Sequence, residues 1–201
     1  MKIKYAILIA SIPGLIASGI LAVNYVKNGM PNANGSTEGL SLRLSHQCFL
    51  DADVIAAQEA WGDAIVDIGD AYTKGADYTA LAVYTIETLY GYDEGTVLFK
   101  PTKASDHQFR VTEQEAISYF VTGSIAEDTG FALHPWSKVR FENERIITNC
   151  DSAIAMGNYY FTDANTGNEV KVEYTFGYQK DENGMPLINI HHSSLPYPGD
   201  D

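Results

Sequence analysis

The residues best suited to chemistry lie in the run Ile188-Asn189-Ile190-His191-His192-Ser193-Ser194. Imidazole exchanges protons near neutral pH, and a hydroxyl both donates and accepts hydrogen bonds. Successive side chains of a strand point to opposite faces, so the even-numbered residues of this run should share one face. Ile188 and Ile190 lie on that face, and because they are apolar they favour it as the inner one. We therefore predict that His192 and Ser194 line a polar cavity, the alternative being a strand that ends in a polar segment.

Helices are predicted ahead of this strand. In residues 51–72, apolar side chains recur at three- and four-residue steps, as on one face of an amphipathic helix. A shorter helix is predicted for residues 77–90. Thr112 and Glu115 form the capping-box pattern at the start of a third helix, residues 113–121.

Strands are predicted on both sides of the third helix. Residues 95–102 favour a short strand that ends at Pro101, which cannot donate to a ladder and leaves Thr102 at the strand end. After Trp136 the apolar period changes to two, which is typical of hairpins in series. Helices first and strands last predict an α+β domain, with the helices on the concave face of a curved antiparallel sheet. Its strands are expected at residues 137–149, 152–163, 169–180 and 185–194.

Size and charge restrict the class of protein. The chain has 201 residues, of which 45% are hydrophobic and 19% charged, which suits one globular domain with additional sequence. From Leu40 onward it has 10 basic and 25 acidic residues, a net charge of −15 against −13 for the whole chain. A domain this acidic is repelled by phosphate backbones, so nucleic acid is excluded as a partner.

The first residues have the pattern of an export signal. Lys2 and Lys4 precede residues 5–23, which carry no charge. We predict that residues 1–23 are a signal peptide or a membrane anchor, that residues 24–44 are a linker, and that residues 45–198 are the folded domain. The basic end and the acidic domain favour a periplasmic or other extracytoplasmic location.

Cysteines and histidines offer no evident metal site. Cys48 and Cys150 could form a disulfide in an oxidising compartment or could be two separate buried side chains. Neither lies in a Cys-x-x-Cys pair, and His191 and His192 should point to opposite faces of their strand. We predict that no metal is bound, the alternative being Zn²⁺ or Mn²⁺ held by His192 and distant residues.

Several motifs between residues 45 and 197 carry a family resemblance. The chain resembles the cone-shaped fold of nuclear transport factor 2 and, within it, the association domain of calcium/calmodulin-dependent kinase II. It is most similar to the iota-class carbonic anhydrases. The motifs are Lys100-Pro101-Thr102, Gln108-Phe109-Arg110, Ser118-Tyr119-Phe120, and the longer segments 134–143, 172–178 and 191–197.

The resemblance implies reversible hydration of carbon dioxide to bicarbonate in a cavity of the cone, in some members without a metal. The matching site residues are Thr102, Tyr119, His192 and Ser194, with Phe120 as the alternative to Tyr119. The three hydroxyls would bind the oxygens of bicarbonate, and His192 would act as the base or orient the attacking water. The alternative interpretation gives all four residues ordinary structural roles.

The resemblance also implies a possible anion-binding arginine, because association domains carry carboxylate-binding arginines in their cavity. Arg140 is the candidate and Arg110 the second, the alternative for each being a surface ion pair. The competing function is a non-catalytic module for oligomerisation or for binding small anions. A homodimer through the open sheet face is expected, because Tyr159, Tyr160 and Phe161 place aromatic rings on both faces of their strand.

Overall fold

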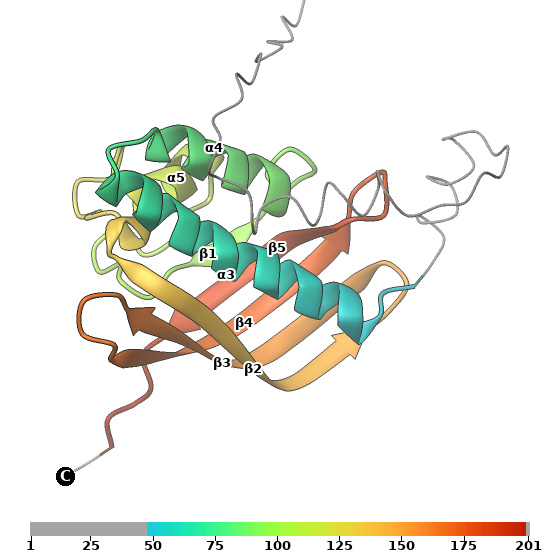
Figure 1. The fold of residues 1–201 in the computed structure, drawn as a ribbon. Coiled ribbons are helices and arrows are strands. Elements are labelled where there is room, and N and C mark those ends of the chain that lie inside the picture. The colour runs from blue at the N-terminus through green and yellow to red at the C-terminus, as the bar shows by residue number, and fades with distance from the viewer. Residues whose placement is uncertain (1–47, 200–201) are drawn as a thin grey trace, which may run out of the picture. The chain divides into compact units, whose positions relative to one another are not determined.

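The computed structural model describes residues 48–199 (Figure 1). The predicted export segment (residues 1–23), the predicted linker (24–44) and the first residues of the predicted domain lie outside this range. Within it, no helix combines the length and the apolar character needed to cross a bilayer.

Five strands form one curved sheet in the order β1-β5-β4-β3-β2 (Figure 1). The four long strands pair antiparallel, which confirms the predicted series of hairpins. The short β1 adds a parallel edge, with Lys100 opposite His192, and so brings the segment after β1 beside the end of β5. The strands are β1 (Leu98–Lys100), β2 (Trp136–Thr148), β3 (Ser152–Asp163), β4 (Glu169–Lys180) and β5 (Pro186–Ser194).

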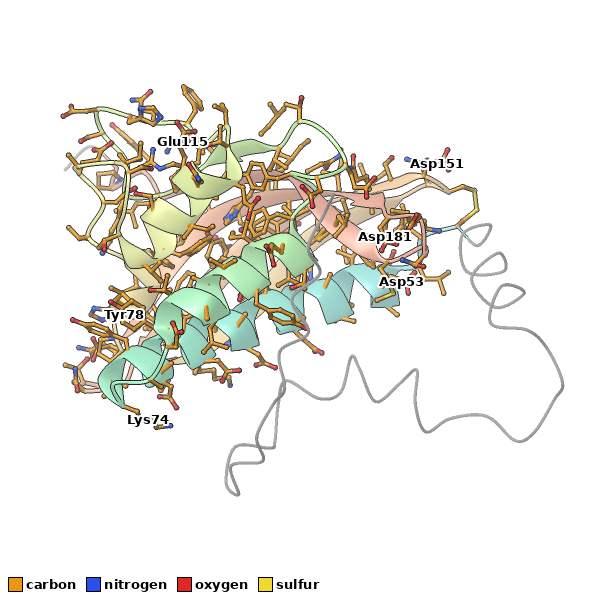
Figure 2. All side chains as sticks on the ribbon, turned by 90° about the horizontal axis from the view of Figure 1, so that it is seen from above. Asp53, Lys74, Tyr78, Glu115, Asp151 and Asp181 are labelled. Carbon is orange, nitrogen blue, oxygen red and sulfur yellow. A yellow bond between two sulfur atoms is a disulfide. The ribbon has the colours of Figure 1, made fainter. Side chains whose placement is uncertain are left out.

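Three α-helices cover one side of the sheet, so the predicted α+β fold is confirmed (Figures 1 and 2). They are α3 (Asp51–Thr73), α4 (Tyr78–Leu89) and α5 (Glu113–Val121), and a 3-10 turn, η1 (Phe131–Leu133), precedes β2. The predicted capping box is present at α5, where Thr112 Oγ1 accepts from Glu115 N and Glu115 Oε2 accepts from Thr112 N.

Trp61 of α3 is the centre of the core between helix and sheet. It is 1% exposed, and its indole meets the surrounding rings edge to face. Such pairs are favoured because the positive edge of one ring meets the negative face of another. The ring partners of Trp61 are Phe120, Phe141, Tyr159, Phe161, Phe176 and His191.

A disulfide joins Cys48 to Cys150 (Figure 2, beside the labelled Asp151). It links the residues just before α3 to the hairpin between β2 and β3. The alternative of two separate buried cysteines is therefore wrong. The bond closes a loop with a sequence separation of 102 residues, which restricts the unfolded chain.

A β-bulge interrupts the pairing of β4 with β5. Tyr178 lies opposite Ile188, but its neighbour Gly177 lies opposite Ile190, so Asn189 is an extra residue in β5. Gly177 permits this approach, because a Cβ there would lie 2.9 Å from both Asn189 Oδ1 and Ile190 Cβ. An extra residue exchanges the two faces of every residue that follows it.

The bulge corrects the predicted face of β5. Ile188 is buried as expected, but beyond the bulge it is His191 and Ser193 that turn inward, at 1% and 2% exposure. His192 is exposed on the outer face. The prediction that His192 and Ser194 share the inner face with the isoleucines is wrong.

Candidate active site

His191 is held by a buried chain of hydrogen bonds. Trp61 Nε1 donates to the Tyr90 hydroxyl over 2.9 Å, and that hydroxyl lies 2.8 Å from His191 Nδ1. The indole can only donate, so among the printed partners of the Tyr90 hydroxyl only Nδ1 can accept the phenol proton, and we assign the hydrogen bond in that direction. The proton of the neutral imidazole is therefore on Nε2.

The Nε2 atom of His191 is buried and has no hydrogen-bond partner in the described structure. The ring cannot easily turn away, because it stacks on Phe99 at 4.5 Å between ring centroids and meets Phe176 at 4.2 Å. A buried N–H group without an acceptor costs about 1–3 kcal/mol. A small ligand with an acceptor oxygen would remove this cost.

Three hydroxyls gather on the same inner surface. Thr102 Oγ1 donates to Ser193 Oγ over 2.9 Å, and both are hydrogen-bonding neighbours of the Tyr159 hydroxyl. Lys100 Nζ donates to the Ser193 carbonyl over 3.2 Å and so fastens the end of β5 to β1. Because hydroxyls rotate to donate or accept, this cluster can bind water or an anion oxygen.

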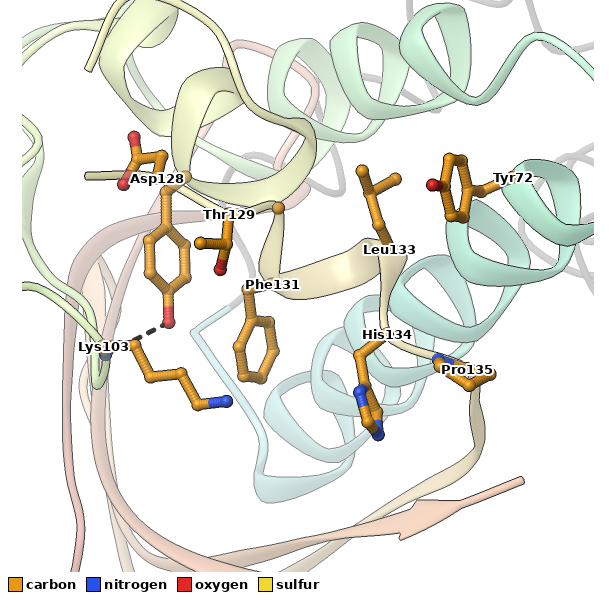
Figure 3. Close-up of a pocket in the computed structure, with 10 residues that line it drawn as sticks. Tyr72, Lys103, Asp128, Thr129, Phe131, Leu133, His134 and Pro135 are labelled. Atoms are coloured by element: carbon orange, nitrogen blue, oxygen red, sulfur yellow. Dashed lines mark hydrogen bonds between the residues drawn. The ribbon is translucent and has the colours of Figure 1, made fainter. Parts of the chain in front are cut away.

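Tyr119 lines a cavity of about 320 Å³ (Figure 3). Its hydroxyl accepts from Lys103 N over 3.4 Å, drawn as the dashed line in Figure 3, and Lys103 follows Thr102 in the chain. Tyr119, Lys103 and His134 are among the residues that line the cavity. Tyr119, rather than Phe120, thus provides the polar group at this position.

Burial keeps the site uncharged. Desolvation raises the pKa of Tyr119 far above its ordinary value, and it raises the pKa of Tyr159 although that hydroxyl has Ser193 and Thr102 as hydrogen-bonding neighbours. Desolvation, together with the nearby His192, lowers the pKa of His191 well below its usual value. At neutral pH these groups are neutral hydrogen-bond donors and acceptors.

The structure brings together some of the predicted site residues and separates others. Thr102 Oγ1 lies beside Ser193 Oγ, and Tyr119 lines the cavity. His192 faces outward, and Ser194 Oγ donates to Glu173 Oε2 over 3.1 Å on the outer side of the sheet. Their places are taken by His191 and Ser193.

The two candidate arginines are engaged elsewhere. Arg140 lies on the outer face of β2, where it pairs with Glu142 and Glu169 and its guanidinium lies 4.2 Å from the Tyr160 ring. It is thus a partly exposed ion-pair residue outside the cavity. Arg110 is fully buried, and its Nη2 donates to Asp128 Oδ1 over 2.6 Å. The surface ion pair expected for Arg110 is therefore wrong.

Sequence reasoning missed His191, Ser193, Tyr159 and Tyr90. One available signal was Gly177, because an isolated glycine inside a strand pattern often marks a bulge. A bulge opposite Gly177 would have exchanged the two faces of β5 beyond it and placed His191, in place of His192, on the inner face. No comparable signal distinguishes Tyr159 or Tyr90 from ordinary core aromatics.

The described residues contain no group of three or more His, Cys, Asp and Glu side chains arranged to hold a metal ion. His191 cannot contribute through Nδ1, because that nitrogen accepts from Tyr90. The buried site therefore offers neutral donors and acceptors to a small ligand.

We predict that His191 reduces stability in mild acid. Its pKa in the folded state lies below the value of about 6.5 in the unfolded chain, so below pH 6.5 only the unfolded chain gains this proton. The free energy of unfolding should therefore fall between pH 7 and pH 5.5 by up to about 1.4 kcal/mol per pH unit from this group. Urea denaturation should show a flatter pH dependence for His191→Gln than for the wild type; equal slopes would contradict the assignment.

Comparison with known proteins places these observations in a family. A family model described as metal-independent carbonic anhydrase matches residues 52–195. A metal-independent carbonic anhydrase from Nostoc sp. strain PCC 7120 is 42% identical over 167 residues, which cover 81% of each chain. The crystal structure of a cyanobacterial iota-carbonic anhydrase complexed with bicarbonate has a TM-score of 0.73 at 41% identity, covering 76% of this chain and 95% of that one.

These matches confirm the predicted family resemblance. The family's description also supports the prediction that no metal cofactor is used. The chain belongs to the metal-independent carbonic anhydrases of the iota class.

Proposed function

We propose that this carbonic anhydrase hydrates carbon dioxide at the buried cluster of Thr102, Tyr159, His191 and Ser193. The observation that carries the proposal is the buried Nε2–H of His191, which has no partner in the described structure. His191 and Ser193 share the inner face of β5 two residues apart, which spaces their Cα atoms by about 7 Å.

The cluster suits both carbon dioxide and bicarbonate. Carbon dioxide is apolar, and the rings of Trp61, Phe99 and Phe176 around His191 provide an apolar wall. Bicarbonate has three oxygens, which the hydroxyls and the imidazole N–H can meet with hydrogen bonds. The bicarbonate in the related crystal structure supports this choice of ligand.

The geometry gives the residues separate roles. The hydroxyls of Thr102, Ser193 and Tyr159 orient the attacking water, and its proton can pass along them because each hydroxyl both donates and accepts. His191 donates its Nε2–H to the substrate oxygen that gains negative charge. His191 does not act as the base, because Nδ1 is engaged by Tyr90 and its pKa is lowered.

We predict that Ser193→Ala lowers kcat/KM for carbon dioxide hydration by about 10²-fold, because one of the hydroxyls that orient the attacking water and pass on its proton is lost. Stopped-flow measurement on the purified chain tests this. Ser194→Ala is the matched control, since it removes the same hydroxyl from the outer face, and it should change the rate less than twofold. A larger loss in Ser194→Ala than in Ser193→Ala would refute the proposed site.

We propose that the domain is exported, and that residues 1–23 act as a cleaved signal or as an anchor. The uncharged segment after two lysines supports this, as does the disulfide, because disulfides persist in oxidising compartments. A reporter that functions only in the cytoplasm, fused after Asp201, should stay inactive. Full reporter activity would count against export.

We propose that two copies of the chain form a homodimer through the outer face of the sheet. Ile147, Ile154, Gly177 and Ile190 form a row across β2 to β5, with Met156 beside it. Ile147, Ile154 and Met156 are 61%, 43% and 55% exposed, so the patch is apolar and uncovered in the described structure. A second copy would bury such a self-complementary patch.

The dimer proposal predicts that Ile154→Glu yields a monomer, because a charge would be buried at the interface. Light scattering after gel filtration measures the mass. Leu81→Glu is the control, because Leu81 is a similarly exposed aliphatic residue on α4. A monomeric wild type, or a dimer that persists in Ile154→Glu, would contradict the proposal.

A further inference from the structure

Each hydration event releases a proton that must leave the protein. The buried groups cannot hold it: the pKa of Tyr119 and Tyr159 is raised, and the pKa of His191 is lowered, in each case chiefly by desolvation. The tyrosines therefore keep their own protons, and His191 gains none near neutral pH. A group nearer to solvent has to receive the proton.

His134 has the geometry of a proton acceptor held in place. Its Nε2 lies 2.7 Å from Asp163 Oδ2, which leaves Nδ1 to take up a proton. The other oxygen of Asp163 accepts from Asn165 N, Thr166 N and Thr166 Oγ1. The carboxylate is thus fixed by its own turn, and its pKa is lowered to about 2, so it stays ionised beside the imidazole.

The backbone of His134 is also fixed. Its segment lies against Gly69 of α3, where a Cβ would approach Ala132 O to 2.9 Å and His134 O to 3.0 Å. The imidazole lies 4.1 Å from the Trp136 ring, between centroids. A larger residue than glycine at position 69 would displace the segment that carries His134.

His134 is a partly exposed residue of the cavity wall. It lines the same cavity as Tyr119 and Lys103, and its side chain is 44% exposed (Figure 3). Tyr119 and Lys103 are joined by a hydrogen bond, and Lys103 follows Thr102 of the hydroxyl cluster. A cavity of about 320 Å³ lined by polar groups has room for several waters.

We propose that His134, oriented by Asp163, receives the proton released by hydration and passes it to buffer. An O–H bond of the attacking water breaks, waters in the cavity carry the proton, and an N–H bond forms at His134 Nδ1. The imidazolium then gives the proton to a base in solution, and bicarbonate leaves separately. The proposal rests on the proposed function and adds the exit route for its proton.

The other ionisable groups around the cavity are less suited to this step. Asp128 is paired with the buried Arg110 and accepts from Ser118. Lys103 and Tyr72 also line the cavity, but a lysine ammonium offers only donors and a phenol is a poor proton acceptor. Asp163 holds His134 and is already ionised. Imidazole is the side chain that both gains and loses a proton in this pH range.

The test compares His134→Ala with the wild type by stopped-flow carbon dioxide hydration in dilute and concentrated buffer. In dilute buffer kcat should fall roughly tenfold, because proton acceptance is lost. By contrast, kcat/KM should stay nearly unchanged, because the cavity waters take the proton as bicarbonate forms, before the proton reaches His134. Added imidazole should restore kcat. If His134 had only a structural role, its removal would not lower kcat at an unchanged kcat/KM, and imidazole would not restore kcat.

His107→Ala is the matched control. His107 also pairs with a carboxylate, Glu115, at 3.2 Å, and its side chain is 47% exposed, but it does not line the cavity. Its removal should leave kcat unchanged in dilute buffer. Two results with an active wild type would overturn the proposed role of His134 alone. One is an unchanged kcat in His134→Ala, and the other is an equal loss of kcat and kcat/KM that imidazole does not restore. A wild type without hydration activity would overturn the proposed function as well.

Discussion

The hydrogen-bond chain from Trp61 through Tyr90 to His191 decides what this interior can do. It joins α3, the end of α4 and β5, so the two helical elements and the sheet hold the imidazole together. Because the phenol proton is directed at Nδ1, the other imidazole nitrogen carries a hydrogen and serves as a donor. The aromatic packing around Trp61 makes that arrangement rigid, and rigidity is what lets a donor stabilise developing charge without reorganising.

A neutral site has consequences for both directions of the reaction. Zinc carbonic anhydrases lower the pKa of a bound water to about 7 with the charge of the ion. At the proposed site oriented neutral donors would replace that charge, so stabilisation of the transition state would depend on geometry more than on net attraction. A bicarbonate held by neutral groups also dissociates more readily than one bound to a cation. In the absence of a ligand, this arrangement leaves the Nε2–H of His191 without a hydrogen-bond partner in the described structure, which is unfavourable.

Much of the fold could be predicted from sequence, because its signals are local. Periodicity and capping gave the three helices to within a residue or two, and the alternation of Val172 to Tyr178 gave β4 with the correct buried face. Thr102 was placed correctly because Pro101 ends its strand. Which face of β5 points inward could not be predicted from local sequence. It depends on the bulge at Asn189, which Gly177 on the neighbouring strand makes possible.

The site was less predictable than the fold because its partners are far apart in sequence. Tyr90 and His191 are separated by 101 residues, and Thr102 and Ser193 by 91. A tyrosine that completes such a pair has the same sequence pattern as one that only fills the core. Cys48 and Cys150 illustrate the same limit, since both pairing and separate burial were consistent with the sequence. Only the folded chain distinguishes these cases.

The charge distribution of the chain affects how carbon dioxide enters and how bicarbonate leaves. Carbon dioxide is uncharged, so the net charge of −15 from Leu40 onward does not oppose its entry. Bicarbonate is an anion, and the acidic surface disfavours its return from solution within a Debye length of about 8–10 Å. Near the site the balance is local: Lys100 donates to the Ser193 carbonyl and Lys103 lines the cavity, so two of the scarce cations stand where the anion forms and leaves. At the proposed site their positive charge would favour the formation of bicarbonate, and the acidic exterior would then favour its departure.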